Sequence, residues 1–222
     1  GNYTINPPSY SKLDANGTVL PDSATTWAMV KDNVTGLIWE NKTNDGSIHD
    51  GSKTFTWCDT NPATNGGNQG TCGTGTGDVA TDTKAFIKAL NDSKFGGFSE
   101  WRMPTAKELL AIVDFGCYAP YLDGTWFPNT HSSYVWTSDT MAYNPIAWSL
   151  DLGLQGSLGN SPKSSSNYVR AVRGESSNHN NYFDNSDGTI TDTATGLMWQ
   201  QAEVGTQSWL DSLPSISRLN LN

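Results

Sequence analysis

Apolar residues recur at helical spacing in two segments of the chain, residues 82–91 and the stretch that follows Thr105. This spacing places the apolar side chains of each segment on one face, as in a short amphipathic helix. In the first segment they are Phe86, Ala89 and Leu90, and in the second Leu109, Ile112 and Val113. The pattern therefore predicts two helices, the first ending before the Gly96-Gly97 pair.

The second helix carries a start signal. Thr105 is a favourable N-cap, and Glu108 follows three residues later, where its carboxylate can reach back to the Thr105 amide as a capping box. Pro104 has no amide hydrogen and holds the residue before it in an extended conformation. We therefore expect residues 101–103 to run as an extended segment into the cap.

Apolar and polar residues alternate in strand-like fashion on both sides of the helices. Residues 27–30 and 37–39 flank the turn 32–36 and predict a hairpin. Similar alternation occurs later in the chain, in residues 133–138, 146–151 and 167–174. Because helices and antiparallel strands are segregated along the chain, the sequence predicts an α+β domain.

A nine-residue motif occurs twice. Residues 32–40, Asp-Asn-Val-Thr-Gly-Leu-Ile-Trp-Glu, return as residues 192–200, Asp-Thr-Ala-Thr-Gly-Leu-Met-Trp-Gln. About 40 residues cannot bury a core of their own, so we expect this second copy either to dock on the first domain or to be partly disordered. The expected organisation is an N-terminal arm (1–25), a main domain (26–174), a linker (175–182) and an incomplete second repeat (183–222).

Composition and net charge exclude some classes of binding partner. Charged residues are only 16% of the chain, whereas Gly (22) and Trp (9) are abundant, which favours loops and short strands around aromatic anchors. The net charge of −9 argues against nucleic acid and against any broad anionic surface as partner. No apolar run approaches the roughly 20 residues that span a membrane, so we expect no membrane insertion. The polar first residues show no signal-peptide pattern.

The three cysteines predict one disulfide. Cys58 and Cys72 enclose an Asn- and Gly-rich loop without apolar periodicity, which a disulfide would stabilise by about 3 kcal/mol. Metal binding is the alternative, but no second Cys or His lies at zinc spacing. Cys117 is then left over, and we expect a buried structural thiol there. None of the three histidines (His49, His131, His179) lies near it in sequence to make it a nucleophile.

Five motifs in order carry a family resemblance. They are residues 35–39, 101–105 with 108–109, 136–138, 147–148 and 169–174. Together they resemble the Lcl C-terminal domain family, named for a bacterial collagen-like adhesin, over roughly residues 27–174. The resemblance implies a C-type-lectin-like fold, related to sulfatase-modifying factors, with two helices against a small twisted antiparallel sheet and long loops. It also implies a secreted or cell-surface protein, and the namesake binds glycosaminoglycans in adhesion.

This chain departs from such relatives in two ways. A net charge of −9 suits a sulfated polyanion poorly. The calcium-lectin signatures Glu-Pro-Asn, Gln-Pro-Asp and Trp-Asn-Asp are missing, and residues 184–192 lack the terminal glutamate of an EF-hand loop. We therefore expect neither a metal site nor a cofactor.

The motif residues are expected to be structural. Large aromatics with one polar group are what a loop-rich domain packs around, and arginines between apolar residues pair with buried carboxylates or carbonyls. The expected structural residues are Trp39, Trp101, Arg102, Pro104, Thr105, Glu108, Trp136, Trp148, Arg170 and Arg173.

In the lectin-like arrangement that the resemblance implies, the long segments between the late strands lie together on one face, so a ligand surface is expected in residues 126–134, 139–145 and 152–167. An aromatic face beside amides and a carboxylate suits a sugar ring. The expected ligand-binding residues are Trp126, Asn129, His131, Tyr134, Asp139, Tyr143, Asn144, Gln155, Asn160 and Asn167.

The resemblance, together with the absence of catalytic motifs, implies a non-catalytic extracellular binding or adhesion module that recognises a glycan or a surface protein through its loops. No Ser-His-Asp set, phosphate loop or HExxH motif is present, and we assign no catalytic residue. Two alternatives stay open. One is an enzyme related to the sulfatase-modifying-factor fold, with Cys117 or a carboxylate active. The other is a purely structural repeat unit of a larger surface protein.

Overall fold

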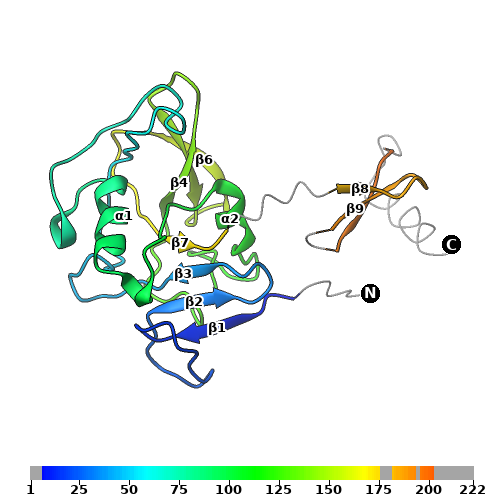
Figure 1. Cartoon of the computed structure of the whole chain (residues 1–222), viewed down its shortest axis with the longest axis horizontal. Coiled ribbons are helices and arrows are strands. Elements are labelled where there is room, and N and C mark those ends of the chain that lie inside the picture. Colours follow the sequence, from blue (N-terminus) through cyan, green and yellow to red (C-terminus); the bar gives the residue numbers. More distant parts are fainter. Residues whose placement is uncertain (1–6, 176–181, 194–195, 203–222) are drawn as a thin grey trace. The chain divides into compact units, whose positions relative to one another are not determined.

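A computed structural model of the chain describes residues 7–175, 182–193 and 196–202. The chain divides into two compact units, Gly1–Ser176 and Ser177–Asn222 (Figure 1). The start of the expected arm, most of the expected linker with His179, and the expected second repeat beyond position 202 lie outside the described residues.

The first sheet of unit 1 is antiparallel, with the strand order β1-β2-β3-β7. Its strands are β1 (Tyr10–Leu13), β2 (Met29–Asp32), β3 (Ile38–Glu40) and β7 (Val172–Arg173). In the turn between β2 and β3, the Asp32 carboxylate accepts hydrogen bonds from the Val34 amide (2.8 Å) and the Thr35 hydroxyl (2.7 Å). Gly36 closes this turn with a φ of 78°, a conformation that glycine adopts at little cost. The predicted hairpin is confirmed, and residues 10–13 join it as an additional strand.

The second sheet of unit 1 is a meander of β4 (Tyr134–Thr140), β5 (Ile146–Asp151) and β6 (Ser157–Pro162). Its register places Val135 opposite Leu150, and Leu150 opposite Leu158. The exposure of these three residues increases from the buried Leu150 and Val135 to Leu158, which is 39% exposed on the outer strand. The sheet is therefore best covered along its first two strands.

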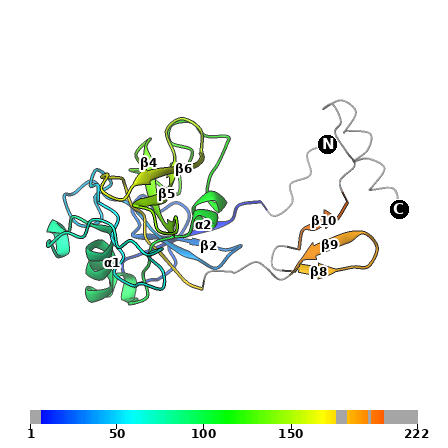
Figure 2. The same cartoon turned by 90° about the horizontal axis from the view of Figure 1, so that it is seen from above.

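Two α-helices form in the segments that the apolar spacing predicts, but the second ends at Ala111, so that Ile112 and Val113 lie beyond it. In α1 (Thr83–Asp92), the Asp82 carboxylate caps the N-terminus by accepting from the Ala85 amide at 2.9 Å. In α2 (Ala106–Ala111), the capping box of Thr105 and Glu108 is present. Two 3₁₀ turns, η1 (Gly77–Val79) and η2 (Phe95–Gly97), lie on either side of α1 in the chain. The two α-helices lie on different sides of unit 1 (Figures 1 and 2).

The core of unit 1 consists of two clusters of buried side chains. One contains Phe86 and Leu90 of α1 together with Trp101 and Trp136. The other contains Leu109 of α2 and, from the two sheets, residues such as Trp39, Val172, Val135 and Leu150. Each helix therefore covers its own part of the core.

Unit 2 contains a third antiparallel sheet in its described part, with the order β10-β9-β8. Its strands are β8 (Tyr182–Asp184), β9 (Thr189–Asp192) and β10 (Met198–Gln200). Trp199 lies opposite Ile190, as Trp39 lies opposite Val30 in unit 1. Trp39 is buried, whereas Trp199 is 58% exposed.

The expected fold class, two helices against one small twisted sheet in a C-type-lectin-like α+β arrangement, is wrong. In the described part of the chain, three separate small antiparallel sheets dominate and the two α-helices are short. The late strands β4 to β6 hydrogen-bond with one another instead of joining the early hairpin, and only β7 returns to β3. The domain is therefore β-rich, and its helices fill separate positions around two sheets.

Candidate functional site

A cavity of about 440 Å³ lies where the disulfide loop, the start of α1 and the segment that leads into α2 meet. Its lining combines apolar side chains with hydroxyl and charged groups. The lining residues are Trp57, Cys58, Asp59, Thr64, Thr83, Lys84, Ile87, Arg102, Met103, Thr105 and Ser138. We call this space the disulfide cavity.

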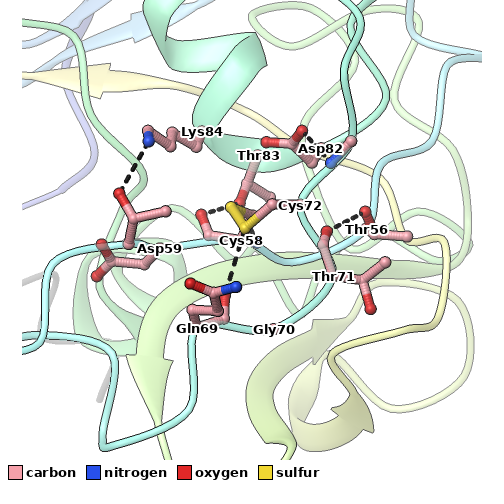
Figure 3. The surroundings of a disulfide bond; sticks show 12 residues. Thr56, Cys58, Asp59, Gln69, Gly70, Thr71, Cys72, Asp82, Thr83 and Lys84 are labelled. Atoms are coloured by element: carbon pink, nitrogen blue, oxygen red, sulfur yellow. Dashed lines mark hydrogen bonds between the residues drawn. A yellow bond between two sulfur atoms is a disulfide. The ribbon is translucent and has the colours of Figure 1, made fainter.

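One wall of the disulfide cavity contains Cys58, which forms a disulfide with Cys72 (Figure 3). The predicted bond is confirmed. Thr83, at the start of α1, holds this wall to the helix: its hydroxyl accepts from the Cys58 amide at 2.9 Å and donates to the Cys58 carbonyl at 3.0 Å. The loop and the helix are therefore fixed relative to each other.

The buried side chain of Lys163 holds the loop between Cys58 and Cys72 in place. Its buried ammonium group donates to the carbonyls of Asn65 (3.0 Å) and Asn68 (2.6 Å) and lies 4.1 Å from the centre of the Trp57 ring. Burial lowers the pKa of Lys163. The two carbonyls and the aromatic face compensate for the water that the ammonium group has lost.

A second wall is the segment that leads into α2. Arg102 makes a bidentate ion pair with Glu108 through bonds of 2.8 and 2.7 Å, and its backbone amide and carbonyl both pair with Val172 of β7. Burial acts to raise the pKa of Glu108, but hydrogen bonds from Arg102 and from the Thr105 amide outweigh it and hold this pKa below its ordinary value. The capping box therefore also fixes a cavity wall.

The chemistry of the disulfide cavity suits binding. Ile87 and Met103 supply half-buried apolar surface, and Ser138 supplies a hydroxyl that has no side-chain hydrogen bond among the described residues. Asp59 already accepts hydrogen bonds from the Asn61 amide and the Thr64 hydroxyl. Among the described residues that line this cavity, none is a histidine that could act as a base.

The residues predicted from sequence to bind ligand are not gathered at this cavity or in any single cluster of side-chain contacts. Trp126 packs against Tyr10 of β1 with ring centres 5.6 Å apart. Tyr143, 92% exposed at the β4–β5 turn, instead lies against Gly67 of the disulfide loop. These two aromatics therefore belong to different parts of unit 1.

The remaining predicted ligand residues divide in the same way. Near the loop before β4, His131 stacks on Tyr168 at 4.7 Å and Asn129 donates to the Lys42 carbonyl. Asp139 accepts from the Ala106 amide at the start of α2. The others are Tyr134, Gln155 and Asn160, which are exposed, Asn144, which is half-buried, and Asn167, which is buried and pairs with Phe55. Asn167 and Asp139 thus have structural partners, and the loop surface stays a prediction.

Most of the predicted structural residues have internal partners. Trp39, Trp101 and Trp136 are at most 2% exposed, whereas Trp148 is only half-buried. The buried Arg170 donates to the Glu40 carbonyl at 2.6 Å and to the Thr130 hydroxyl at 2.7 Å. Burial lowers the pKa of Arg170 to about 10, although the Glu40 carboxylate opposes this shift. Two positions complete the set: Pro104 is buried and Arg173 pairs with Glu100 at 3.1 Å.

The expected burial of Cys117 is wrong, because this free cysteine is half-exposed. Its partial desolvation and the nearby Asp114 carboxylate raise the pKa of the thiol. A raised pKa reduces the thiolate fraction at neutral pH, which opposes nucleophilic activity.

Sequence reasoning did not identify Lys84, Ile87 or Lys163 as parts of a site. Lys84 and Ile87 read as ordinary positions of an amphipathic helix, and Lys163 stands in a polar loop pattern. The one available signal was the disulfide itself, because a covalently closed loop must pack against some neighbouring element.

Two further properties concern the described part of the chain. Within it, no group of three or more His, Cys, Asp or Glu side chains is placed to hold a metal ion. None of its helices is long and apolar enough to cross a membrane.

Comparison with known proteins gives one family match. Residues 28–173 match the family model of the Lcl C-terminal domain. Searches of the curated proteins and of the solved structures found no match. The matched segment runs from the start of the first hairpin to the end of β7, and so includes both walls of the disulfide cavity. The chain therefore belongs to the Lcl C-terminal domain family.

Proposed function

We propose that this chain is a non-catalytic binding module of a surface-associated protein and that it holds a neutral glycan in the disulfide cavity. Family membership supports a surface-associated domain. The observation that carries the ligand proposal is the cavity of about 440 Å³, whose lining segments are fixed by the disulfide and by the Arg102–Glu108 pair. Rigid walls favour binding because little order has to be imposed on the protein when the ligand enters.

The lining supports a sugar residue as the occupant. A sugar ring has an apolar C–H face and a rim of hydroxyls. Ile87 and Met103 offer a surface for the former, and Ser138, Lys84 and the charged groups around the cavity offer donors and acceptors for the latter. A cavity of this size and mixed lining is typical of small-molecule sites.

The distribution of positive charge favours a neutral ligand over a sulfated one. Among the described residues, four cationic side chains are buried, and each lies against an aromatic ring: Lys12 on Trp27, Lys42 on Phe86, Lys163 on Trp57 and Arg170 on Phe127. Arg102 is paired with Glu108. These five cations are committed to partners within the protein, and the net charge of −9 opposes the binding of a polyanion.

The test is a glycan array probed with the parent protein and three variants. Ser138→Phe should fill the disulfide cavity without removing a side-chain hydrogen bond, and should abolish binding of any glycan found. Trp126→Ala and Tyr143→Ala test the loop surface predicted from sequence, and should leave binding within about twofold.

Near-UV circular dichroism of each variant controls for folding. If folded Ser138→Phe binds like the parent, the disulfide cavity is not the site. If Trp126→Ala or Tyr143→Ala instead loses binding, the loop surface carries it.

A further inference from the structure

A second cavity, of about 370 Å³, lies elsewhere in unit 1, where the start of β1, the end of α2 and the loop around residue 125 meet. Its lining is unlike that of the disulfide cavity, because aromatic rings and carboxylates make up most of it. The residues that matter are Tyr10, Phe115, Trp126, Phe127, Asp114 and Asp123. We call this space the aromatic cavity.

The rings of the aromatic cavity form a corner. The Tyr10 ring lies 5.6 Å from the Trp126 ring at 50° and 5.5 Å from the Phe127 ring at 83°. Phe127 is buried and anchors the corner, whereas Phe115 is 72% exposed. Tilted and edge-on rings of this kind present π faces in more than one direction.

Two carboxylates stand beside these rings, and each is fixed by its own turn. Asp114 accepts from the Gly116 amide at 2.7 Å, and Asp123 accepts from the Thr125 amide at 2.8 Å. Each bond uses one carboxylate oxygen. The second oxygen of Asp123 has no hydrogen-bond partner in the described part of the chain, and that of Asp114 faces only the weak thiol donor of Cys117.

Negative charge in the aromatic cavity is not neutralised locally. Among the described residues that line it, none is basic. The ammonium group of Lys12 lies 5.7 Å from the Trp126 ring, but it donates to the carbonyls of Asp22 and Ala24 and sits closer to Trp27, at 3.9 Å. Burial, and then the carboxylates of Asp32, Asp114 and Asp123, raise the pKa of Tyr10 to about 12, as expected near excess negative charge.

We propose that the aromatic cavity binds a small organic cation, such as a quaternary ammonium group. The rings of Tyr10, Trp126 and Phe115 line the cavity and attract the cation through their quadrupoles. The carboxylates of Asp114 and Asp123 supply the opposite charge. This site is separate from the glycan site proposed above, since the two cavities share no lining residue.

The first test uses the parent protein with choline and with 3,3-dimethylbutan-1-ol, a neutral molecule of nearly the same shape. Isothermal titration calorimetry should show choline binding about tenfold tighter than the alcohol, as cation–π attraction and two carboxylates require. Equal affinities, or no choline binding at all, would overturn the proposal. This comparison does not depend on the folding of any variant.

The second test locates the site. The double variant Asp114→Asn with Asp123→Asn keeps the size and the turn-forming oxygen of each side chain, and should weaken choline binding about tenfold. Asp92→Asn, a matched change at an exposed carboxylate on α1, and Ser138→Phe in the disulfide cavity should leave it unchanged. Retained choline binding in the folded double variant would exclude the aromatic cavity.

Co-sedimentation with phosphatidylcholine vesicles distinguishes two sources of the same ammonium group. If the protein sediments with the vesicles and free choline prevents this, the source is a lipid headgroup. Protein that stays in the supernatant while it binds choline identifies a free cation.

Discussion

Replacing Cys58 and Cys72 together by alanine should destabilise unit 1 by about 3 kcal/mol. The disulfide joins residues 14 positions apart, and closing a loop of about 15 residues in the unfolded chain has an entropic value of about that size. The lost bond leaves the unfolded chain freer and so lowers the free energy of unfolding. For a chain of this length, the corresponding fall in melting temperature is about 6–12 °C.

Below the melting temperature, the native contacts of the loop should keep the variant folded. Lys163 still donates to the Asn65 and Asn68 carbonyls, and Thr83 still bonds both backbone groups of residue 58. We therefore expect the variant to fold with the loop near its present position. The wall of the disulfide cavity is then held by hydrogen bonds alone. We therefore expect glycan binding to weaken even at 25 °C, where the variant is still folded.

Urea unfolding followed by tryptophan fluorescence measures this loss, with and without reductant. Cys117→Ala is the matched control, since it removes an unpaired cysteine, and its unfolding midpoint should stay close to that of the parent. Reductant should shift the midpoint of the parent but not that of the double variant. If the double variant unfolds at the parent's midpoint, the loop is ordered by its packing and the entropic argument fails.

Three further predictions concern other residues. Trp101→Ala should cost about 3–5 kcal/mol, because the side chain is 2% exposed and leaves a cavity; a melting curve like the parent's would contradict the core described here. Glu108→Gln should make the free energy of unfolding fall less steeply at acid pH. The folded-state pKa of Glu108 lies below its ordinary 4.5, so the stability that its carboxylate contributes is present above pH 4.5 and is lost as the pH falls through the folded-state pKa. Cys117 should react with iodoacetamide more slowly at pH 7 than glutathione does, since its thiol pKa is raised, and fast labelling would favour the enzyme alternative.

Local features of this fold were predictable from the sequence. The capping box at Thr105 and Glu108 depends on residues three positions apart, and the hairpin around Gly36 depends on a short turn. The disulfide followed from the composition of the enclosed loop. In each case the determining residues are close neighbours in the chain.

The sheet arrangement was not predictable in the same way. Alternation marks residues 134–140 and 146–151 as strands, but it does not say whether they pair with each other or with the early hairpin. The return of β7 to β3 brings Val172 opposite Trp39 across more than a hundred residues, and the same Val172 pairs with Arg102. Such pairings depend on the packing of the whole unit.

The disulfide cavity was hidden for the same reason. Its walls come from the loop closed by Cys72, from α1 at Lys84 and Ile87, and from Met103 before α2. None of these residues has an unusual local pattern. These residues form a site only because the folded chain brings them close together.

The burial of cations against aromatic rings has a consequence for the chemical reactivity of the chain. Amine-reactive esters need an accessible, deprotonated lysine, so the buried Lys12, Lys42 and Lys163 should escape modification in the native state. Lys84 is exposed and lines the disulfide cavity, so it should be among the first lysines to acylate. Amine coupling would therefore place part of any dye or solid support beside the proposed glycan site, and the rest at exposed lysines such as Lys88, Lys94 and Lys107.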